Sequence, residues 1–237
     1  MSKHQYQQGI FSSKETIVLD VPDAEIEYYP QFMTDDDGWR FFERILQESE
    51  WRQERITIFG KSHLTPRLSC WMGDEGLNYS YSNLTMIPEP WSATLRLIKR
   101  QLETQTHETF NSVLINYYRD GQDSNGWHSD DEPELGINPT IASLSLGGHR
   151  DFKLRHKTNK GLSYTLSLEH GSLLMMRGTT QQCWQHQIPK RAKANARLNL
   201  TFRTIKSKYT GKPSKQAQQN NTGRRVKKEV DGYGILD

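Results

Sequence analysis

The chain changes its hydrophobic pattern near residue 108. Before that point, two segments repeat apolar residues at the period of a helix, 34–51 and 90–105. Thr34 is followed by acidic residues and suits the start of the first helix, and Pro90 suits the first turn of the second. We therefore expect two amphipathic helices. Their apolar stripes are Trp39, Phe42, Ile45 and Leu46 in the first, and Leu95, Ile98 and Leu102 in the second.

From residue 108 onwards, apolar and polar residues alternate with the period of two that is typical of strands. The alternating runs read FNSVLINYYRDG, TIASLSLGG, RDFKLRHK, LSYTLSLEHG, GSLLMMRG and ARLNLTFRTI. No helix-length segment separates these runs, so they predict an antiparallel β-sandwich or barrel and argue against a parallel βαβ sheet. The segment RITIFGKSHLTPR adds a strand and a turn around Gly60 and Lys61. The expected fold class is mainly β with α additions, a helical N-terminal layer packed on a β-sandwich.

The composition is that of a globular protein in a reducing compartment. The 237 residues are 34% hydrophobic with a mean hydropathy of −0.83, and they contain no apolar run of transmembrane length. The segment MSKHQYQQGIFSSKE lacks the apolar core of a secretory signal. Cys70 and Cys183 have no CxxC spacing, which argues against a disulfide framework and a structural zinc site. We therefore expect an intracellular protein without a membrane partner, nuclear in a eukaryote and cytoplasmic in a bacterium.

The net charge of +3 hides a basic C-terminal segment. Residues 206–237 hold eight Lys and Arg residues against three acidic ones, in a polar stretch rich in Gln and Asn. Such a stretch has too little apolar surface to fold by itself, so we expect a disordered tail. Two interpretations stay open at this point: a solubilising segment, or a flexible electrostatic contact to nucleic acid.

The stretch NGWHSDDEPELG places a histidine among carboxylates. His128 and Asp130 are two residues apart, so on a strand their side chains would point to the same side. His186, which lies ahead of the last predicted strand, is the candidate for a third ligand. Two histidines and one carboxylate form the facial triad of non-haem Fe(II) oxygenases, which leaves coordination positions open for substrate and O2. On spacing alone, the alternative is a surface turn with an unrelated histidine.

The last predicted strand, RLNLTFR, has one polar face and one apolar face. The apolar face, which suits the core, consists of Leu198, Leu200 and Phe202. The polar face holds two guanidinium groups, an amide and a hydroxyl, from Arg197, Asn199, Thr201 and Arg203. Such a face is either solvated or binds an anion, and two arginine forks suit a ligand with two carboxylates. In LINYYRDG, an amide and a phenol share one side and could complete the same anion site, from Asn116 and Tyr118.

These motifs together resemble the AlkB-type Fe(II)/2-oxoglutarate dioxygenases. HSD at 128–130, His186, NxY at 116–118 and RxNxTFR at 197–203 occur in the order and spacing of that family. The strings VLINYYRDG, HSDDE, IASLSLGGHRDFKLRHK, HGSLLMMRG and RLNLTFR are most similar to the branch that acts on double-stranded DNA in vertebrates. The resemblance covers residues 50–206.

The resemblance implies a fold and residue roles. The fold would be a double-stranded β-helix, or jelly roll, with a helical and lid layer on the N-terminal side. The iron ligands, which are also the catalytic residues, would be His128, Asp130 and His186. The 2-oxoglutarate contacts would be Asn116, Tyr118, Arg197, Asn199, Thr201 and Arg203. The expected divisions are an N-terminal extension at 1–25, helices with a nucleotide-recognition lid at 26–107, a catalytic core at 108–206 and a tail at 207–237.

The resemblance also implies contacts to a nucleic-acid substrate. The residues concerned are Phe59, Gly60, Lys61, Tyr79, Ser80, Tyr81, Asp131 and Glu132. Phe59 would fill the gap left by a flipped base, and Lys61 would meet a phosphate. The tyrosines would line the base pocket, and the two carboxylates would recognise the damaged base. The alternatives are a core aromatic for Phe59, sheet packing for the tyrosines and a solvated turn for the carboxylates.

The sequence departs from the double-strand branch in one loop. After RHK, the segment TNKGLSYTLSLEHG is shorter than the basic loop with which that branch grips the second DNA strand. Arg155, Lys157 and Lys160 remain. Two explanations stay open: the basic tail substitutes for the loop, or the preferred substrate is single-stranded.

The implied reaction is an oxidative dealkylation that uses Fe(II), 2-oxoglutarate and O2. It would remove N-alkyl groups, such as those of N1-methyladenine and N3-methylcytosine, from flipped-out DNA bases and release formaldehyde, succinate and CO2. The partner would be alkylated DNA, duplex or single-stranded, bound by a monomer. The alternatives are an RNA demethylase with the same chemistry and a non-catalytic nucleic-acid-binding jelly roll.

Overall fold

The structure, a computed structural model, describes residues 15–58, 60–77, 79–81 and 84–206. At 57–58, 79–81 and 84–86 the description is limited to the backbone. Two expectations fall outside the described residues, the wedge role of Phe59 and the disordered tail at 207–237.

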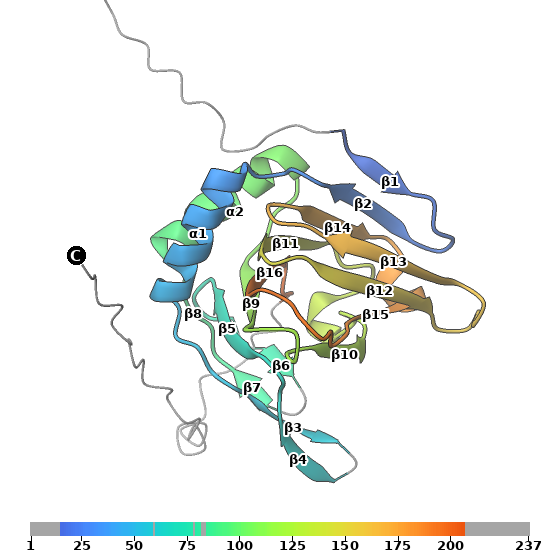
Figure 1. Cartoon of the computed structure of the whole chain (residues 1–237). Coiled ribbons are helices and arrows are strands. Elements are labelled where there is room, and N and C mark those ends of the chain that lie inside the picture. The colour runs from blue at the N-terminus through green and yellow to red at the C-terminus, as the bar shows by residue number, and fades with distance from the viewer. Residues whose placement is uncertain (1–14, 59, 78, 82–83, 207–237) are drawn as a thin grey trace, which may run out of the picture.

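Strands dominate the described chain (Figure 1). They are β1 (Ile17–Leu19), β2 (Glu25–Tyr29), β3 (Arg55–Ile58), β4 (Lys61–Leu64), β5 (Leu68–Gly73), β6 (Tyr79–Tyr81), β7 (Leu84–Met86), β8 (Glu89–Pro90), β9 (Ser112–Tyr118), β10 (Asn125–His128), β11 (Ile141–Gly147), β12 (Arg150–His156), β13 (Ser163–Leu168), β14 (Leu173–Arg177), β15 (Trp184–Ile188) and β16 (Arg197–Arg203). The helices are α1 (Asp35–Glu48), α2 (Ala93–Thr106) and α3 (Thr180–Cys183), with a short 3-10 helix η1 (Pro133–Leu135). None of the described helices is both long and apolar enough to span a membrane.

Two sheets face each other and form a jelly roll. The major sheet has eight strands in the order β1-β2-β14-β11-β16-β9-β5-β8, and the minor sheet has four in the order β10-β15-β12-β13. Buried apolar side chains from both sheets, including Trp71, Phe152 and Trp184, fill the space between them. In Figure 1 the two layers lie one over the other. The expectation of a mainly β, double-stranded β-helix fold is therefore confirmed.

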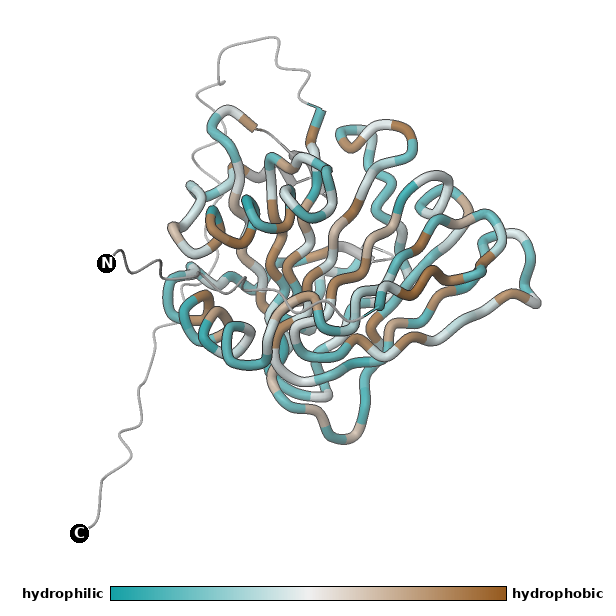
Figure 2. Tube along the Cα trace, turned by 90° about the horizontal axis from the view of Figure 1, so that it is seen from above, coloured by the Kyte–Doolittle hydropathy of each residue, from teal (hydrophilic) through white to brown (hydrophobic). Residues whose placement is uncertain are grey.

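The helices α1 and α2 cover the other face of the major sheet. A second apolar cluster joins helix residues such as Phe41 and Ile98 to sheet residues such as Val113 and Leu200. Figure 2 shows the brown, apolar segments concentrated along the central strands and the adjoining helices, whereas the outer loops are mostly teal. The helical layer thus supports the sheet from outside, and the lid expected beside it stays a prediction.

Hydroxyl caps start both long helices. Thr34 Oγ1 accepts a hydrogen bond from the backbone nitrogen of Asp37 at 3.3 Å, as the sequence pattern predicts. Ser92 Oγ accepts one from the backbone nitrogen of Leu95 at 3.2 Å. The prediction that Pro90 lies in the first turn of the second helix is wrong, because Pro90 ends strand β8 and the helix begins at Ala93. The hydroxyl of Ser92 accepts a hydrogen bond from a backbone N–H of the first helical turn, whereas proline has no side-chain acceptor, so the helix starts after the serine.

The major sheet crosses the divisions expected from the sequence. Strand β1 lies within the supposed N-terminal extension, and β2, to which it pairs, joins β14 of the core. Strand β5 pairs with β9 along its whole length. This strand reads LSCWMG, in which polar and apolar residues do not alternate, so the sequence pattern did not reveal it. The segments before residue 108 therefore complete the catalytic sheet and do not form a separate layer alone.

The contact between α1 and a histidine predicts an unusual effect of Gly38→Ala. Alanine normally favours a helix over glycine by about 1 kcal/mol. Here a Cβ at Gly38 would lie 2.3 Å from Nε2 of His170. That ring cannot move freely, since Nδ1 accepts from the backbone nitrogen of Gly147 at 2.7 Å and the ring stacks on Trp39. We expect the variant to lose about 1–2 kcal/mol of unfolding free energy in urea titrations.

The matched control for Gly38→Ala is the same change in a His170→Ala background. Without the imidazole the clash is absent, so helix propensity alone should act and the substitution should stabilise the protein. A stabilising effect of Gly38→Ala in the wild-type background would contradict the clash.

Candidate active site

A cavity lies between the two sheets. Its walls bring together side chains from both sheets and from the loops beside them. They include Asn116, Tyr118, Ser143, Asn199, Thr201 and Arg203 of the major sheet, His128, Phe152 and His186 of the minor sheet, and Glu54, Thr65, Arg67, Ser69, Asn125, Asp130 and Glu132. The cavity therefore unites the two clusters that the sequence pattern placed apart, the histidine–carboxylate cluster and the polar face of β16.

Three candidate metal ligands meet at one point of this cavity. Strands β10 and β15 are antiparallel neighbours, and their register sets His128 directly opposite His186. The ring centroids of the two histidines are 4.2 Å apart, and Nε2 of His186 lies 3.9 Å from Oδ2 of Asp130. One ligand atom from each residue falls within 4.8 Å of the others. Two imidazoles and one carboxylate form the donor set of a facial triad, so the residues fit Fe(II).

The sequence pattern identified the ligand residues but not their strands. His128 ends β10 and His186 lies in the middle of β15, and neither strand was predicted. Strand β10 reads NGWH and contains a glycine and an amide, and the register between β10 and β15 shifts within it. Such a strand gives little periodic signal. The site therefore does not rest on two ligands of one strand. His128 meets His186 by cross-strand pairing, and Asp130 joins them from the turn after β10.

Asp130 is held in place by its backbone and by its carboxylate. Its backbone nitrogen donates to Oε1 of Gln181 at 2.9 Å, and Nη2 of Arg203 donates to its Oδ1 at 2.6 Å. Burial opposes ionisation of this carboxyl, but the electrostatic effect of its surroundings, of which Arg203 contributes most, outweighs burial and holds the pKa below its usual value. Asp130 is therefore a buried carboxylate, ready to bind a cation. Gln181 was not foreseen, because nothing in TTQQCW distinguishes it from a surface glutamine.

The two histidines direct ring nitrogens to the cavity. Burial and the neighbouring His128 lower the pKa of His186 to about 3, and its ring stacks on Phe152 with centroids 5.0 Å apart. Nδ1 of His128 lies 2.8 Å from the backbone oxygen of Gly126. That oxygen only accepts, so Nδ1 carries the proton and Nε2 keeps its lone pair. A metal ion requires this deprotonated nitrogen.

The polar face of β16 lies at the inner end of the cavity. Asn199, Thr201 and Arg203 line the wall, while Arg197 lies deeper and is fully buried. Nη2 of Arg197 donates to Oγ of Ser145 and to Oδ1 of Asn199, both at 2.9 Å. Its Nε and Nη1 are buried and have no hydrogen-bond partner among the described residues. Because buried guanidinium N–H groups require acceptors, this end of the cavity suits a carboxylate, as 2-oxoglutarate would supply.

Tyr118 lies between two buried arginines. The guanidinium carbons of Arg197 and Arg150 are 5.3 Å and 5.4 Å from the centroid of its ring. Burial lowers the pKa of Arg197 to about 10, although the phenol of Tyr118 opposes this, so the side chain stays a cation at neutral pH. Arg150 donates to the backbone oxygens of Asp123 at 2.8 Å and Pro189 at 2.6 Å. Arg150 therefore ties together the loops next to β10 and β15, a role that its position after a glycine pair did not reveal.

The residue just ahead of β5 is an arginine that the sequence analysis missed. Arg67 is buried, and its Nε donates to Oδ1 of Asn116 at 2.8 Å. Nη1 of Arg67 donates to the backbone oxygen of Ser124 at 3.4 Å. Because β5 was not predicted as a strand, the inward direction of Arg67 had no sequence signal.

The residues expected to contact substrate divide into three groups. Glu132 lines the cavity, whereas Asp131 is exposed and its carboxylate accepts from Nζ of Lys157 at 3.0 Å. Gly60 forms the exposed turn of the β3–β4 hairpin with φ of 75°, and Lys61 next to it is exposed. Tyr79, Ser80 and Tyr81 form β6, whose side chains are not described, and Phe59 lies outside the described residues. The structure thus places Glu132 in the cavity and takes Asp131 out of it.

Comparison with known proteins links this cavity to one group of enzymes. Residues 25–203 match the model of the 2OG-Fe(II) oxygenase superfamily. The chain is 42% identical over 195 residues to the human alpha-ketoglutarate-dependent dioxygenase alkB homolog 3, covering 78% of this chain and 68% of that protein. It is 45% identical over 178 residues to the human DNA oxidative demethylase ALKBH2, covering 69% of this chain and 68% of that protein.

Two further comparisons show how far this similarity extends. The chain spans 65% of the length of the rat alkB homolog 3, to which it is 42% identical. A solved structure, "The structure of OsALKBH1", matches 80% of this chain and 99% of its own, with a TM-score of 0.56 and 16% identity. At that identity the match supports the fold alone.

Proposed function

Since the chain belongs to the AlkB family within the 2OG-Fe(II) oxygenases, the branch of alkB homolog 3 and ALKBH2, we propose that it is a DNA repair demethylase. The observation that carries the proposal is the geometry of one cavity, in which His128, Asp130 and His186 adjoin the buried guanidinium of Arg203. Fe(II), 2-oxoglutarate and O2 are the metal and co-substrates of the family. When bound, they supply the oxidation of the N-alkyl carbon.

The chain's own residues bind and orient the reactants. His128, Asp130 and His186 would hold the metal. The two histidines lie on the adjoining strands β10 and β15, Asp130 follows the end of β10, and all three line the cavity. Arg197 and Arg203 would hold the carboxylates of 2-oxoglutarate, helped by the amide of Asn199. Phe152 and Ile188 line the cavity beside the metal ligands and exclude water from it. Exclusion of water strengthens each of these charge interactions.

The substrate that fits this cavity is a single base that has left the duplex stack. A metal site recessed between two sheets cannot reach a base inside a helix, so base flipping or a single strand is required. We propose N1-methyladenine and N3-methylcytosine as substrates, with formaldehyde, succinate and CO2 as products. Their alkyl groups lie on the Watson–Crick edge, which flipping exposes.

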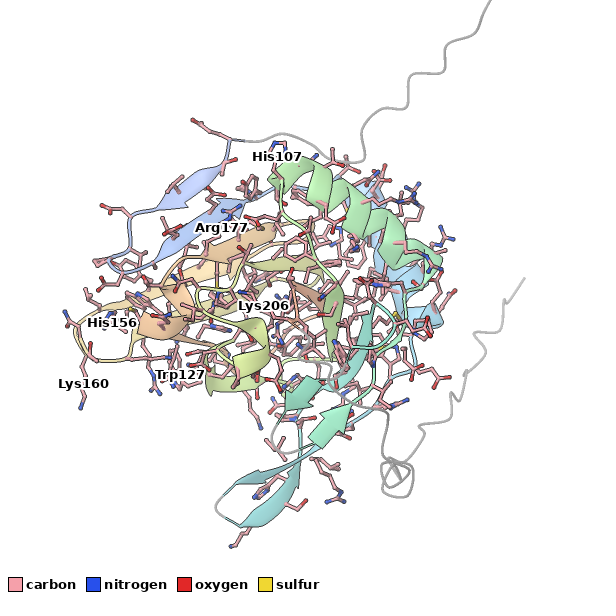
Figure 3. The ribbon with its side chains drawn as sticks, turned by 180° about the vertical axis from the view of Figure 1, so that it is seen from behind. His107, Trp127, His156, Lys160, Arg177 and Lys206 are labelled. Atoms are coloured by element: carbon pink, nitrogen blue, oxygen red, sulfur yellow. The ribbon has the colours of Figure 1, made fainter. Side chains whose placement is uncertain are left out.

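The outer face of the minor sheet supports a contact with DNA and gives a role to Trp127. The guanidinium carbon of Arg155 lies 4.3 Å from the centroid of the Trp127 ring, and Arg155 donates to Oε1 of Gln185 at 2.8 Å and 3.0 Å. Figure 3 shows Trp127 and Lys160 at the same end of the molecule, with Lys160 pointing outward. Trp127, the neighbour of His128 in the chain, therefore helps to hold the exposed cation of Arg155 on this outer face.

We expect Arg155→Ala to weaken DNA binding through the loss of one phosphate contact. In fluorescence anisotropy, the slope of log binding constant against log salt should fall by about one. The matched control is Arg44→Ala on α1, an exposed arginine on the far side of the major sheet, which should leave the slope unchanged. Equal slopes for Arg155→Ala and the wild type would show that Arg155 does not contact the DNA.

The test of the proposed function compares three oligonucleotides of one sequence. Each carries N1-methyladenine or N3-methylcytosine, in duplex DNA, single-stranded DNA or RNA, and is incubated with the full chain, Fe(II), 2-oxoglutarate and O2. We expect formaldehyde and succinate in equal amounts with DNA. Faster turnover of the RNA than of the DNA would mean that RNA is the substrate. If the oligonucleotides caused no succinate release above the level measured without them, a non-catalytic binding protein would be favoured.

We propose that the protein acts as a monomer in the compartment that holds the genome. All residues assigned to the metal and to 2-oxoglutarate come from one chain. The compartment would be the nucleus in a eukaryote and the cytoplasm in a bacterium. Sedimentation of the protein with and without DNA tests the first point.

A further inference from the structure

A carboxylate that the sequence pattern did not single out, Glu54, lines the cavity. It lies just ahead of β3 and shares the cavity wall with Thr65, Arg67 and Glu132. The sequence had assigned recognition of the base to Asp131 and Glu132, of which Asp131 is exposed and meets Lys157. Among the described residues, the cavity therefore has two carboxylates beside that of Asp130, and they come from opposite parts of the chain.

Backbone hydrogen bonds hold Glu54 at a fixed place on the wall. Arg52 and Ser69 exchange two backbone hydrogen bonds, of 2.9 Å and 2.8 Å, which join this segment to β5. The backbone nitrogen of Thr65 donates to the oxygen of Glu54 at 2.8 Å, and Nε2 of Gln53 donates to the oxygen of Thr65 at 2.9 Å. Glu54 is thus attached to the rigid sheet and not to the tip of the β3–β4 hairpin.

The same attachment connects Glu54 to the inner part of the site. Ser69 of β5 is the register partner of Asn116 in β9, and both side chains line the cavity. Arg67 also lines the cavity. Its guanidinium donates to Asn116 and Ser124, and it forms no ion pair with Glu54 among the described contacts. The carboxylate of Glu54 is therefore available to a ligand in the cavity.

A carboxylate in a recessed cavity discriminates by charge. N1-methyladenine and N3-methylcytosine are cations at neutral pH, because alkylation of a ring nitrogen that bears no hydrogen adds a positive charge. N1-methylguanine and N3-methylthymine are neutral, because their alkyl group replaces a hydrogen. In surroundings of low dielectric, a carboxylate attracts the first pair several times more strongly than it would in water, and it gains nothing from the second.

We propose that Glu54 recognises the positive charge of the alkylated base and sets a preference for cationic over neutral lesions. The inference rests on the proposed function, since it assumes that an alkylated base enters this cavity. Together with Glu132, which also lines the cavity, this gives the site a second carboxylate that can recognise the base, from the segment before β3.

The experiment measures kcat/KM for oligonucleotides with a cationic lesion, N3-methylcytosine, and with a neutral one, N3-methylthymine. We expect Glu54→Gln, which keeps the shape and removes the charge, to lower the ratio of the two values by about tenfold. Glu54→Asp keeps the charge and should stay within about threefold of the wild-type ratio. The matched control is Glu43→Gln on the exposed face of α1, which changes the net charge equally and should leave the ratio as it is.

A binding measurement makes the test independent of turnover and of how the variant folds. Without O2, the wild-type protein should bind the N3-methylcytosine oligonucleotide more tightly than the N3-methylthymine one in fluorescence anisotropy. Equal binding, or an unchanged ratio of kcat/KM in Glu54→Gln, would overturn the role of Glu54. Failure of the proposed function looks different, because the wild type would then give no succinate with any methylated DNA.

Discussion

Replacing His128 by alanine should reduce succinate and formaldehyde formation to background. The imidazole is one of three ligands brought together by the pairing of β10 with β15, and no other described histidine or carboxylate joins this cluster. Loss of a group that merely orients a ligand costs 10–100-fold, so loss of a ligand itself should cost more than about 100-fold in metal affinity. His128 is half-buried at the end of its strand, so the fold should survive its removal.

The measurement for His128→Ala combines metal titration with turnover. Calorimetry with Mn²⁺ and 2-oxoglutarate reports binding, and circular dichroism reports the fold. The matched control is His149→Ala, an exposed histidine in the turn between β11 and β12, which should bind metal and turn over as the wild type does. Full metal affinity in His128→Ala would remove this residue from the metal site.

Periodicity predicted those parts of the fold in which one face of an element is apolar. In β16, every second residue faces the core around α1 and α2, and the residues between them face the cavity, so strand and polar face could both be read from RLNLTFR. The apolar stripe of α1 could also be predicted from the sequence, although one of its members, Trp39, is 46% exposed. Where a hydrophobic pattern has two distinct faces, the sequence alone determines both the element and its direction.

The parts that could not be predicted lack that contrast. Strand β5 reads LSCWMG, in which polar and apolar residues do not alternate, so it was not predicted, and the inward direction of Arg67 just ahead of it was missed as well. Strand β10 is short and bulged, so its contribution to the site follows from its neighbour β15 and not from its own sequence. Asp131 and Glu132 are adjacent in the chain, yet one faces the cavity and the other faces Lys157. The sequence alone does not show which of the two carboxylates faces the cavity, because this depends on the local backbone conformation.

The cavity couples its metal end to its co-substrate end through one side chain. Arg203 belongs to the polar face of β16, yet its Nη2 contacts the carboxylate of Asp130 at 2.6 Å. The charge that suits a dicarboxylate therefore also keeps the metal ligand ionised. Arg197, six residues earlier in the same strand, makes no described contact with Asp130, so its substitution tests the co-substrate end alone.

Arg197→Lys should raise KM for 2-oxoglutarate and leave KM for the oligonucleotide unchanged. Lysine keeps the charge, but it loses the planar fork and the two hydrogen bonds of Nη2 to Ser145 and Asn199. A hydrogen bond to a charged group contributes about 1.5–3 kcal/mol, so the loss of one such bond from the guanidinium to a carboxylate of 2-oxoglutarate should raise KM by roughly 10- to 100-fold. Steady-state kinetics with each substrate varied in turn gives both constants.

Ligand-induced stabilisation provides the second measurement for Arg197→Lys. A ligand at 100 times its dissociation constant stabilises the folded state by about 2.7 kcal/mol, so 2-oxoglutarate with Mn²⁺ should raise the Tm of the wild type. At the same concentrations the variant should show little increase. The matched control is Arg100→Lys on the exposed side of α2, which should respond as the wild type does. If Arg197→Lys kept the wild-type KM and the full rise in Tm, the unpartnered Nε and Nη1 of Arg197 would not belong to the co-substrate site.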